Sequence, residues 1–298
     1  MSNDATRCGF VAIIGRPNVG KSTLLNRLLG QKLSITSRKP QTTRHQLLGI
    51  KTDGRNQVLY VDTPGIHGGE RKAINRYMNR SAKSTVRDVD VVVLVNDRGQ
   101  WTRDDEVVAD VLTNSTVQLI IAINKIDLLK DKQQLLPKLA SLQEKFPKAQ
   151  LVPLSAENGD NVERLESLVE AMLPEGPFYY PGDQLTDRSE RFLVSEIVRE
   201  KMMRRLGDEL PYAVTVQVDR FESAGDVTHI DTTIFVERSG QKAILIGKGG
   251  DTLKKIVSDA RCDMEKMVDN KVMLNVWVKM KSGWSDDERA LKSLGYDE

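Results

Sequence analysis

The sequence GRPNVGKS at residues 15–22 decides how the first part of the chain folds. An apolar, β-branched run at residues 10–14 precedes it and an amphipathic stretch at residues 21–29 follows it, which predicts a buried strand, a glycine-rich loop and a helix. Such a loop lets successive backbone N–H groups point inward, and the positive end of the helix dipole adds to the attraction for an anion. We therefore expect a phosphate-binding loop, composed of Gly15, Arg16, Pro17, Asn18, Val19, Gly20, Lys21, Ser22 and Thr23.

Two side chains of this loop carry specific chemistry. Lys21 is placed to reach the β- and γ-phosphates of a nucleotide, and the Ser22 hydroxyl is placed to bind Mg²⁺. The alternative interpretation is an ordinary glycine-rich turn. That alternative does not explain why a predicted buried strand precedes the loop and a predicted helix follows it.

Short apolar runs alternate with amphipathic stretches as far as residue 173. The predicted strands are residues 10–14, 58–61, 89–95, 118–123 and 151–154, and the predicted helices are residues 21–29, 71–85, 104–112, 133–145 and 162–172. This alternation is typical of an α/β fold, a doubly wound, mostly parallel sheet with helices on both faces. The turn signal Asp53-Gly54 joins residues 47–52 and 57–61 as a hairpin, so we expect one antiparallel edge strand.

A proline- and glycine-rich segment at residues 174–182 cannot continue a helix and marks the predicted domain boundary. Beyond it the pattern predicts a helix at 188–206, strands at 213–218 and 228–237, a glycine-rich turn, a helix ending near 268 and a strand at 272–280. We expect a nucleotide-binding domain at residues 1–175, a linker at 176–186, a smaller α+β domain at 187–284 and an acidic tail at 285–298.

Three further motifs follow predicted strands of the sheet. They are Asp62, Thr63, Pro64 and Gly65, then Asn124, Lys125, Ile126 and Asp127, and finally Ser155 with Ala156. The first offers a carboxylate to Mg²⁺ and the Gly65 N–H to a γ-phosphate. The Asp127 carboxylate can accept from N1–H and the exocyclic amine of guanine, a donor pair that adenine lacks, and the third motif can offer a backbone N–H to guanine O6. Helix capping explains Asn124 and Asp127 in isolation, but four motifs at strand ends in this order favour a guanine nucleotide.

These motifs resemble those of the translation-factor-related class of small GTPases. The resemblance implies that the chain binds GTP and GDP with Mg²⁺ and hydrolyses GTP to GDP and phosphate. Residues 40–44 resemble the switch segment whose threonine completes the Mg²⁺ shell, so Ser22, Asp62 and a threonine are the implied metal ligands. We favour Thr43 as this threonine and keep Thr42 as the alternative. The implied catalytic residues are Lys21, Thr43, Gly65 and Asn18.

One position departs from the Ras type of small GTPase. Ile66 stands where that type has the glutamine that orients the attacking water, which an aliphatic side chain cannot do. Intrinsic hydrolysis is therefore expected to be slow or to depend on a group supplied from elsewhere. Asn18 resembles the asparagine with which related GTPases hold a monovalent cation near the phosphates, so we expect K⁺ to stimulate hydrolysis. His45 and His67 are interpreted as solvated loop residues.

The second domain carries a GxxG motif in an informative context. Apolar residues precede Gly247-Lys248-Gly249-Gly250, and Leu253 and Ile256 follow at the spacing of a buried helical face. This arrangement resembles a type II KH domain, in which the GxxG loop links two helices and grips the backbone of about four nucleotides. A helix–helix turn with a C-cap glycine is the alternative. The implied RNA-binding residues are Ile246, Gly247, Lys248, Gly249, Gly250, Lys254, Lys255, Trp277 and Lys279.

Two assignments in this domain concern packing. Trp277 lies among lysines on one face of the last strand, where it either stacks on a base or packs beneath the helix. Met202, Met203 and Met264 are interpreted as core residues.

A GTPase domain followed by a type II KH domain resembles the ribosome-assembly GTPases. The resemblance implies binding of small-subunit ribosomal RNA near the 3′ end of 16S rRNA, a role in maturation of the 30S subunit, and loose peripheral association with the inner membrane. With 44 Lys and Arg against 42 Asp and Glu and no secretory signal in view, we expect a monomeric, cytoplasmic protein without a DNA partner. A scaffold whose KH-like unit binds protein is one alternative. A P-loop kinase is another, against which the motif at residues 124–127 argues.

Overall fold

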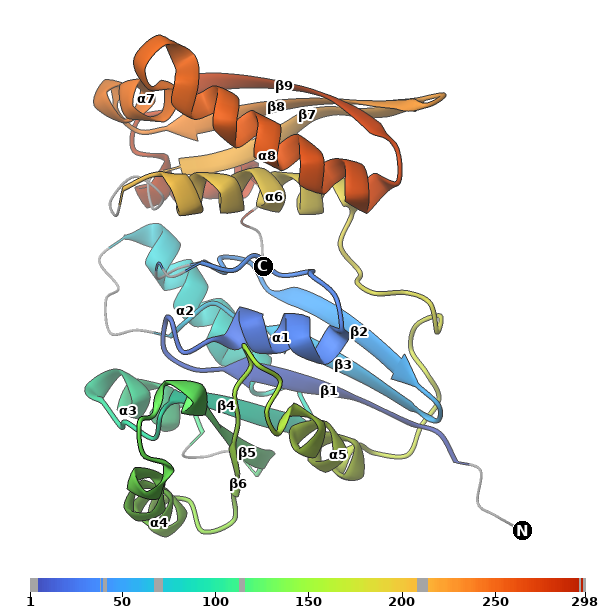
Figure 1. Cartoon of the computed structure of the whole chain (residues 1–298), viewed down its shortest axis with the longest axis vertical. Helices are drawn as coiled ribbons and strands as arrows, with labels where there is room; N and C mark the ends of the chain where they lie inside the picture. The colour runs from blue at the N-terminus through green and yellow to red at the C-terminus, as the bar shows by residue number, and fades with distance from the viewer. Residues whose placement is uncertain are drawn as a thin grey trace. The chain divides into compact units, whose positions relative to one another are not determined.

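The computed structural model describes residues 5–37, 39, 42–66, 72–112, 116–207, 214–294 and 296. The chain divides into two compact units (Figure 1). The first comprises Met1–Ser34, Thr43–Glu70 and Asn75–Asp187, and the second comprises Ile35–Thr42, Arg71–Ile74 and Arg188–Glu298. The segment predicted as a linker, residues 176–186, therefore belongs to the first unit.

A six-stranded sheet forms the centre of the first unit, with strand order β2-β3-β1-β4-β5-β6. The strands are β1 (Arg7–Ile14), β2 (Leu47–Asp53), β3 (Asn56–Asp62), β4 (Val91–Asp97), β5 (Gln118–Asn124) and β6 (Gln150–Pro153). β2 pairs antiparallel with β3, and the other neighbouring strands are parallel. The predicted doubly wound, mostly parallel sheet with one antiparallel edge strand is confirmed.

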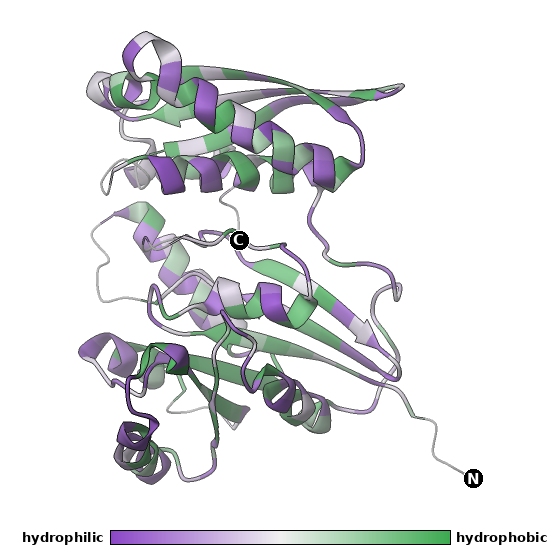
Figure 2. Ribbon diagram, in the orientation of Figure 1, coloured by the Kyte–Doolittle hydropathy of each residue, from purple (hydrophilic) through white to green (hydrophobic). Residues whose placement is uncertain are grey.

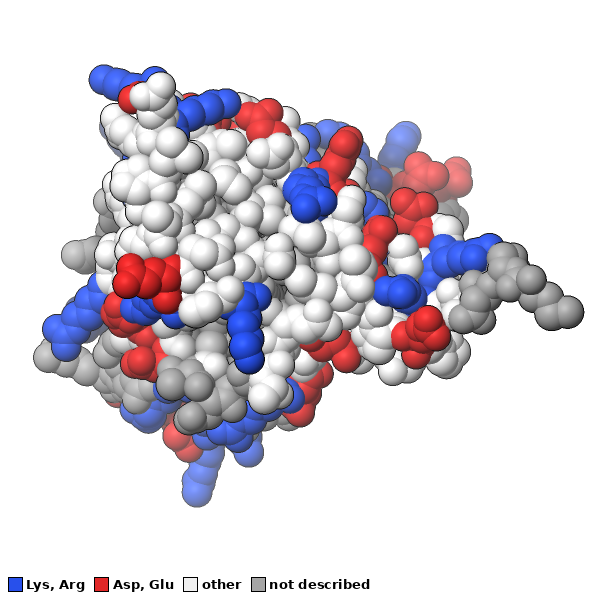
Figure 3. Space-filling model, turned by 90° about the horizontal axis from the view of Figure 1, so that it is seen from below, with Lys and Arg blue, Asp and Glu red and all other residues white. Residues whose placement is uncertain are grey.

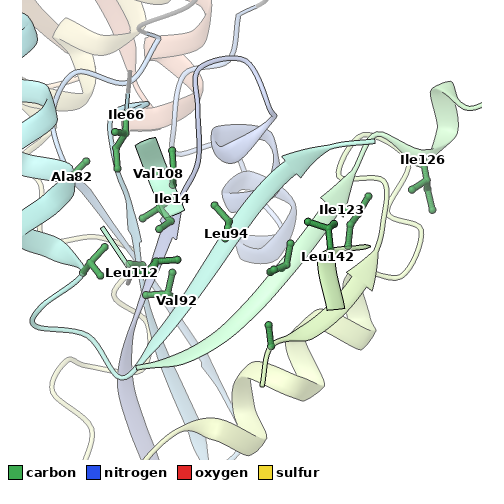
Figure 4. Packing of buried hydrophobic residues seen from close by; sticks show 14 of the residues in the cluster. Ile14, Ile66, Ala82, Val92, Leu94, Val108, Leu112, Ile123, Ile126 and Leu142 are labelled. Atoms are coloured by element: carbon green, nitrogen blue, oxygen red, sulfur yellow. The ribbon is translucent and has the colours of Figure 1, made fainter. Parts of the chain in front are cut away.

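Helices pack against this sheet (Figure 1). They are α1 (Lys21–Leu29), α2 (Ala73–Thr85), α3 (Arg103–Asp110), α4 (Leu135–Lys145) and α5 (Val162–Met172), with 3-10 turns at Ile126–Leu128 and Lys132–Gln134. Side chains of α2, α3 and α4, among them Ala82, Val108 and Leu142, form one buried cluster with side chains of β1, β4 and β5 (Figure 4). α1 lies against α5 and against β1, β2 and β3.

β4 shows why the centre of this sheet is stable. Every residue from Val91 to Val95 is completely buried. A parallel strand covered on both faces has no solvent side, so its sequence is a continuous apolar run and does not alternate. Each such buried side chain contributes about 1.5–3 kcal/mol relative to an exposed one. Figure 2 shows the contrast with the helices, along which hydrophilic and hydrophobic residues alternate.

The segment after α5 is tied to the sheet by Gln57, which is fully buried near the start of β3. Its Oε1 accepts hydrogen bonds from the N–H groups of Tyr179 (2.9 Å) and Tyr180 (3.0 Å), and its Nε2 donates to the Tyr180 carbonyl (2.8 Å). Further along, the Ile50 N–H of β2 donates to the Leu185 carbonyl at 2.8 Å. Residues 176–185, which we call the edge segment, therefore pack along the outer strand of the sheet.

The second unit contains a three-stranded sheet of order β7-β8-β9, in which β7 and β8 are antiparallel and β8 and β9 are parallel. Its elements are α6 (Glu190–Arg205), β7 (Val214–Ala224), β8 (Val227–Val236), α7 (Ser239–Ile246), α8 (Asp251–Val268), β9 (Lys271–Met280) and α9 (Glu288–Ser293), with 3-10 turns at Lys248–Gly250 and Trp284–Asp286. α6 and α8 contribute Val198 and Ala260 to a core shared with Ile234 of β8. Met202, Met203 and Met264 are buried as predicted.

One strand of this sheet is longer than predicted. The apolar pattern indicates a strand at 213–218, whereas β7 extends to Ala224 and turns at Gly225 (φ 60°) into β8. Polar side chains interrupt the pattern after residue 218. The backbone nevertheless continues to pair with β8, as in the pair Glu222 and His229, and Phe221 is the one apolar side chain of β7 after residue 218 that packs on the core. Residue 213 lies outside the described part of the chain.

The predicted acidic tail packs onto the second unit. Trp284 is completely buried, and its ring centroid lies 6.1 Å from that of Tyr296. Asp287 caps α9, because its Oδ1 accepts from the N–H groups of Arg289 (2.8 Å) and Ala290 (3.1 Å). One acidic residue of the tail thus caps its short helix, and the aromatic rings attach the segment to the rest of the second unit.

The face seen in Figure 3 carries both signs of charge. Lys and Arg side chains are interspersed with Asp and Glu around a broad uncharged area, so this face presents no strong field of a single sign. In the part of the chain that the structure describes, each helix is too short or too polar to cross a membrane.

Replacing Gln57 with Leu tests the attachment of the edge segment. Gln57→Leu removes the acceptor for the N–H groups of Tyr179 and Tyr180 and the donor to the Tyr180 carbonyl, so it should lower the free energy of unfolding by about 1–3 kcal/mol. Urea unfolding followed by circular dichroism measures this change. Gln133→Leu, at an exposed position, is the matched control and should change it by no more than about 0.5 kcal/mol. Equal unfolding midpoints for the two variants would contradict the attachment.

Candidate functional site

The candidate nucleotide site lies at the carboxyl ends of β1, β3 and β5, where open α/β sheets bind ligands. The phosphate loop joins β1 to α1 and passes very close to the end of β5. A Cβ on Gly20, whose φ is 100°, would lie 2.4 Å from Asn124 Nδ2, so this position requires glycine. Asn124 Nδ2 donates to the Val19 carbonyl at 2.8 Å. The phosphate loop and the predicted guanine motif are therefore packed directly against each other.

Lys21 is almost completely buried at the first position of α1. Its Nζ donates to the carbonyls of Gly15 (3.0 Å) and Arg16 (3.1 Å). Burial lowers the pKa of Lys21 to about 8, the Asp62 carboxylate opposes this change, and the Arg16 charge adds to it. A phosphate beside Nζ would favour the charged form. The position thus suits the predicted contact with phosphates.

Four side-chain oxygens gather beside Lys21, and we call them the oxygen cluster. Asp62 Oδ2 accepts from Ser22 Oγ at 2.9 Å, from Ser34 Oγ at 2.9 Å and from Thr43 Oγ1 at 3.1 Å. The hydroxyl oxygens of Ser22 and Thr43 are 2.8 Å apart. β1, β3 and the loops beside them thus bring the three predicted metal ligands together with one further hydroxyl.

The oxygen cluster fits a hard divalent cation. Asp62 Oδ1 is buried and has no hydrogen-bond partner among the described residues. Burial raises the pKa of Asp62, while the Lys21 charge and the three hydroxyl donors oppose the rise. A cation would satisfy Oδ1 and favour the ionised carboxylate. Carboxylates and other oxygen ligands are what Mg²⁺ takes in proteins.

Two findings refine the predicted ligand set. Thr43 is the threonine whose hydroxyl lies in the oxygen cluster, because Thr42 Oγ1 donates instead to the Lys39 carbonyl at 2.7 Å. Ser34 was missed by the sequence analysis. It lies in a loop where neither motif nor periodicity marks it, and only the fold brings it to Asp62.

The chain after Asp62 passes over the phosphate loop. A Cβ on Gly65 would lie 2.9 Å from Pro17 N, so only glycine lets the two backbones come this close. Ile66 is fully buried in the cluster that α2 and α3 cover (Figure 4), which is consistent with its inability to orient water. His45 is half-buried with its ring edge-on to Tyr77 at 6.3 Å, so it is less solvated than predicted. The other histidine assignment, at residue 67, lies outside the described residues.

The guanine motif is built around the ends of β5 and β6. Asp127 is exposed, and its Oδ1 accepts from Ser155 Oγ at 2.6 Å, which fixes the carboxylate at the surface. The N–H of Ala156 donates to Asn124 Oδ1 at 2.9 Å, and that of Ser155 donates to the Asp160 carbonyl at 3.0 Å. Both amides thus have partners within the chain. The N–H that this loop was expected to offer to guanine O6 stays a prediction.

In the second unit, the GxxG motif forms the turn between α7 and α8. Gly247, Gly249 and Gly250 all have positive φ, and a Cβ on Gly247 would lie 2.2 Å from Thr252 Oγ1. Position 247 therefore requires glycine, whereas the positive φ at positions 249 and 250 favours glycine without a steric clash. A groove of about 520 Å³ begins at this turn and runs between α8 and β9. It is lined by Gly250, Leu253, Lys254, Val257, Ser258, Arg261, Leu274, Asn275 and Val276.

The structure brings together some of the predicted RNA-binding residues and separates others. Gly250 and Lys254 line the groove. Trp277 is 49% exposed on the face of β9 that points away from the core, so it does not pack beneath the helix. Arg261 and Asn275 also line the groove and were not predicted, because single polar residues in a helix and a strand carry no motif.

Comparisons with known proteins agree with this geometry. A family model described as 50S ribosome-binding GTPase matches residues 10–125, and a KH-domain model matches residues 209–285. The chain is 59% identical over 294 residues to the GTPase Era of Pseudomonas putida (strain W619), covering 99% of this chain and 98% of that protein. The chain belongs to the Era family of GTPases. Another Era-family relative, from Pseudomonas fluorescens (strain Pf0-1), is 57% identical and covers 98% of both chains.

Solved structures of Era-family proteins share this fold over almost the whole chain. An Aquifex aeolicus Era variant bound to GDP·AlF4⁻ matches with a TM-score of 0.95 at 34% identity, covering 98% of this chain and all of that one. Era in complex with MgGDPNP and nucleotides 1506–1542 of 16S ribosomal RNA matches with a TM-score of 0.95 at 35% identity and the same coverage. The fold is therefore an Era-type GTPase sheet followed by a KH domain, and the chain is a GTPase.

Proposed function

We propose that this Era-family GTPase is a nucleotide-controlled switch that binds the 3′ region of 16S rRNA through its KH unit and acts in the maturation of the 30S subunit. One observation carries the proposal: a single chain holds both the phosphate loop with its oxygen cluster and the GxxG groove. The related Era structure bound to MgGDPNP and nucleotides 1506–1542 of 16S rRNA supports the same two classes of ligand here.

In this proposal the phosphate loop holds GTP or GDP, and Ser22, Thr43 and Asp62 hold Mg²⁺. The metal neutralises charge that develops on the transferred phosphoryl group. Lys21 stabilises the same charge from the amino end of α1. The Gly65 N–H, beside the phosphate loop, is the group that senses the γ-phosphate. Loss of that phosphate would release the segments around Thr43 and Gly65, which is how such a switch changes state.

The proposed hydrolysis mechanism has to work without a glutamine. Ile66 is buried, so stabilisation of the transition state has to come from charge placed near the phosphates. Asn18 has a left-handed backbone (φ 65°) at the tip of the phosphate loop, and we infer that its side chain helps to hold K⁺ there.

GTP turnover should therefore be several-fold faster in potassium chloride than in sodium chloride at equal ionic strength. Phosphate release at saturating GTP measures the difference. Asn18→Ala should remove most of the difference while leaving GDP binding in place. Equal turnover of the unaltered protein in the two salts would rule out the monovalent-cation site.

Asp127 tests the assignment of the base. Asp127→Asn exchanges an acceptor for a donor, so affinity should pass from guanine to xanthine nucleotides, with a loss of GTP affinity of about 10²-fold or more. Competition binding with GTP and XTP measures the change. Asp110→Asn, at an exposed position of α3, is the control and should keep guanine preference. Unchanged selectivity in Asp127→Asn would remove this residue from base recognition.

The GxxG turn is the proposed RNA contact, and both of its central residues are exposed. Replacing Lys248 and Gly249 with Asp places two negative charges where phosphates approach, and Asp tolerates the positive φ of Gly249 better than most residues do. Binding of an oligonucleotide that spans nucleotides 1506–1542 should fall by about tenfold or more. GTP affinity should not change. Lys292→Asp, on the exposed side of α9, is the matched control, and RNA affinity equal to the control would exclude this turn as the contact.

Crosslinking in cells distinguishes the proposal from a protein-binding scaffold. Sequencing of the captured RNA should recover the 3′ region of 16S rRNA, whereas capture of proteins without RNA would favour the scaffold. Association with the 30S subunit, the monomeric state and peripheral membrane association stay predictions from the family resemblance.

A further inference from the structure

A carboxylate outside every motif lies between the phosphate loop and the guanine motif. Asp97, the last residue of β4, is mostly buried, with 11% of its side chain exposed. Its Oδ2 accepts from Lys125 Nζ at 3.0 Å, and its Oδ1 accepts from Arg98 Nε at 2.7 Å. A guanidinium nitrogen of Arg16 lies 3.9 Å from Oδ2. One carboxylate thus faces three cations from three separate loops.

Two of these cationic side chains, Lys125 and Arg16, connect Asp97 to the phosphate loop. Lys125 Nζ also donates to the Asn18 carbonyl at 2.6 Å. Arg16 belongs to the loop itself, and its Nε donates to Asp105 Oδ2 at 3.2 Å. Asp105 is in turn buried within the capping box of α3. The tip of the phosphate loop is therefore held by side chains that Asp97 holds in place.

The backbone around Asp97 needs such support. Asn18, Arg98 and Lys125 all have left-handed φ values, of 65°, 53° and 63°. Non-glycine residues adopt this conformation at a cost and keep it where surrounding contacts determine it. The Arg98 N–H donates to the Asn124 carbonyl at 2.9 Å, so the turn after β4 is bonded to the end of β5. Each of the three loops therefore contains a residue with an unfavourable left-handed backbone. The contacts between the carboxylate and the cations stabilise this backbone conformation.

Asp97 is ionised at neutral pH. Burial would raise the pKa of this carboxyl, but hydrogen bonds and charges from Lys125 and Arg98 more than offset burial, so the pKa lies below its usual range. Exposed ion pairs contribute little to stability. Hydrogen bonds between charged groups that are mostly buried are stronger and fix geometry.

We propose that Asp97 is a positioning residue for guanine-nucleotide binding. Its carboxylate holds Lys125 and Arg16 in place, so that the phosphate loop and the guanine motif are correctly positioned relative to each other before the nucleotide binds. This proposal rests on the GTPase activity of the Era family and is independent of the proposed RNA role. Asp97 acts through Lys125 and Arg16 and does not touch the reacting atoms. Its loss should therefore weaken binding and leave the chemical step in place.

Asp97→Asn keeps the shape of the side chain and removes its charge. GDP and GTP affinities should both fall by about 10- to 100-fold, because charge-assisted hydrogen bonds to Lys125 and Arg98 are weakened. kcat at saturating GTP should change by less than about threefold. Asp97→Glu restores the charge and should recover part of the affinity. Asp88→Asn, at an exposed position after α2, is the control and should bind as the unaltered protein does.

A double-mutant cycle with Lys125→Met tests whether Asp97 acts through Lys125. If it does, the double variant should lose clearly less affinity than the sum of the two single losses. Additive losses, unchanged affinity in Asp97→Asn, or a fall in kcat with affinity retained would each overturn the proposal. Thermal unfolding without nucleotide shows whether Asp97→Asn is folded. If Asp97→Asn is not folded, Asp97→Glu provides the test. A folded Asp97→Glu variant that binds nucleotide as weakly as Lys125→Met would also overturn the proposal.

Discussion

In the nucleotide site, three loops meet at the side chain of Asn124, which is 2% exposed. Its amide donates to the Val19 carbonyl, and its Oδ1 accepts from the N–H groups of Lys125 and Ala156. A buried polar group without a partner costs about 1–3 kcal/mol, so the loops after β1, β5 and β6 are restricted to one mutual arrangement. Gly20 is part of the same constraint, because any side chain there would displace the carboxamide.

This rigid arrangement keeps two charges away from water. Burial lowers the pKa of Lys21 and raises that of Asp62, so each residue is held where its charged form is disfavoured. An anionic phosphate and a divalent cation would each supply the missing opposite charge. Nucleotide binding and folding stability are therefore coupled in this protein, since a ligand that binds only the folded state stabilises it in proportion to RT ln(1 + [L]/Kd).

Local sequence patterns predicted most of the fold and much of the site. The apolar run of β4, the turn at Asp53-Gly54 and the context of the GxxG motif each depend on neighbours a few residues away. Ser34, Gln57 and Asp97 act on residues distant in sequence and follow no periodicity, so the sequence alone could not mark them. For Trp277, strand alternation predicted the face, but only tertiary packing determines whether a helix covers it.

The edge segment also affects how the chain behaves during its own synthesis. β2 is the outer strand of the sheet, and the rings of Phe178 and Tyr180 pack on a cluster that contains Leu48 and Ile50 of that strand. Chains emerge from the ribosome amino end first and fold domain by domain. A nascent chain ending at residue 175 would already contain all six strands but expose an outer edge open to pairing with other chains. The first unit therefore shields its edge from neighbouring nascent chains only after translation has passed residue 185.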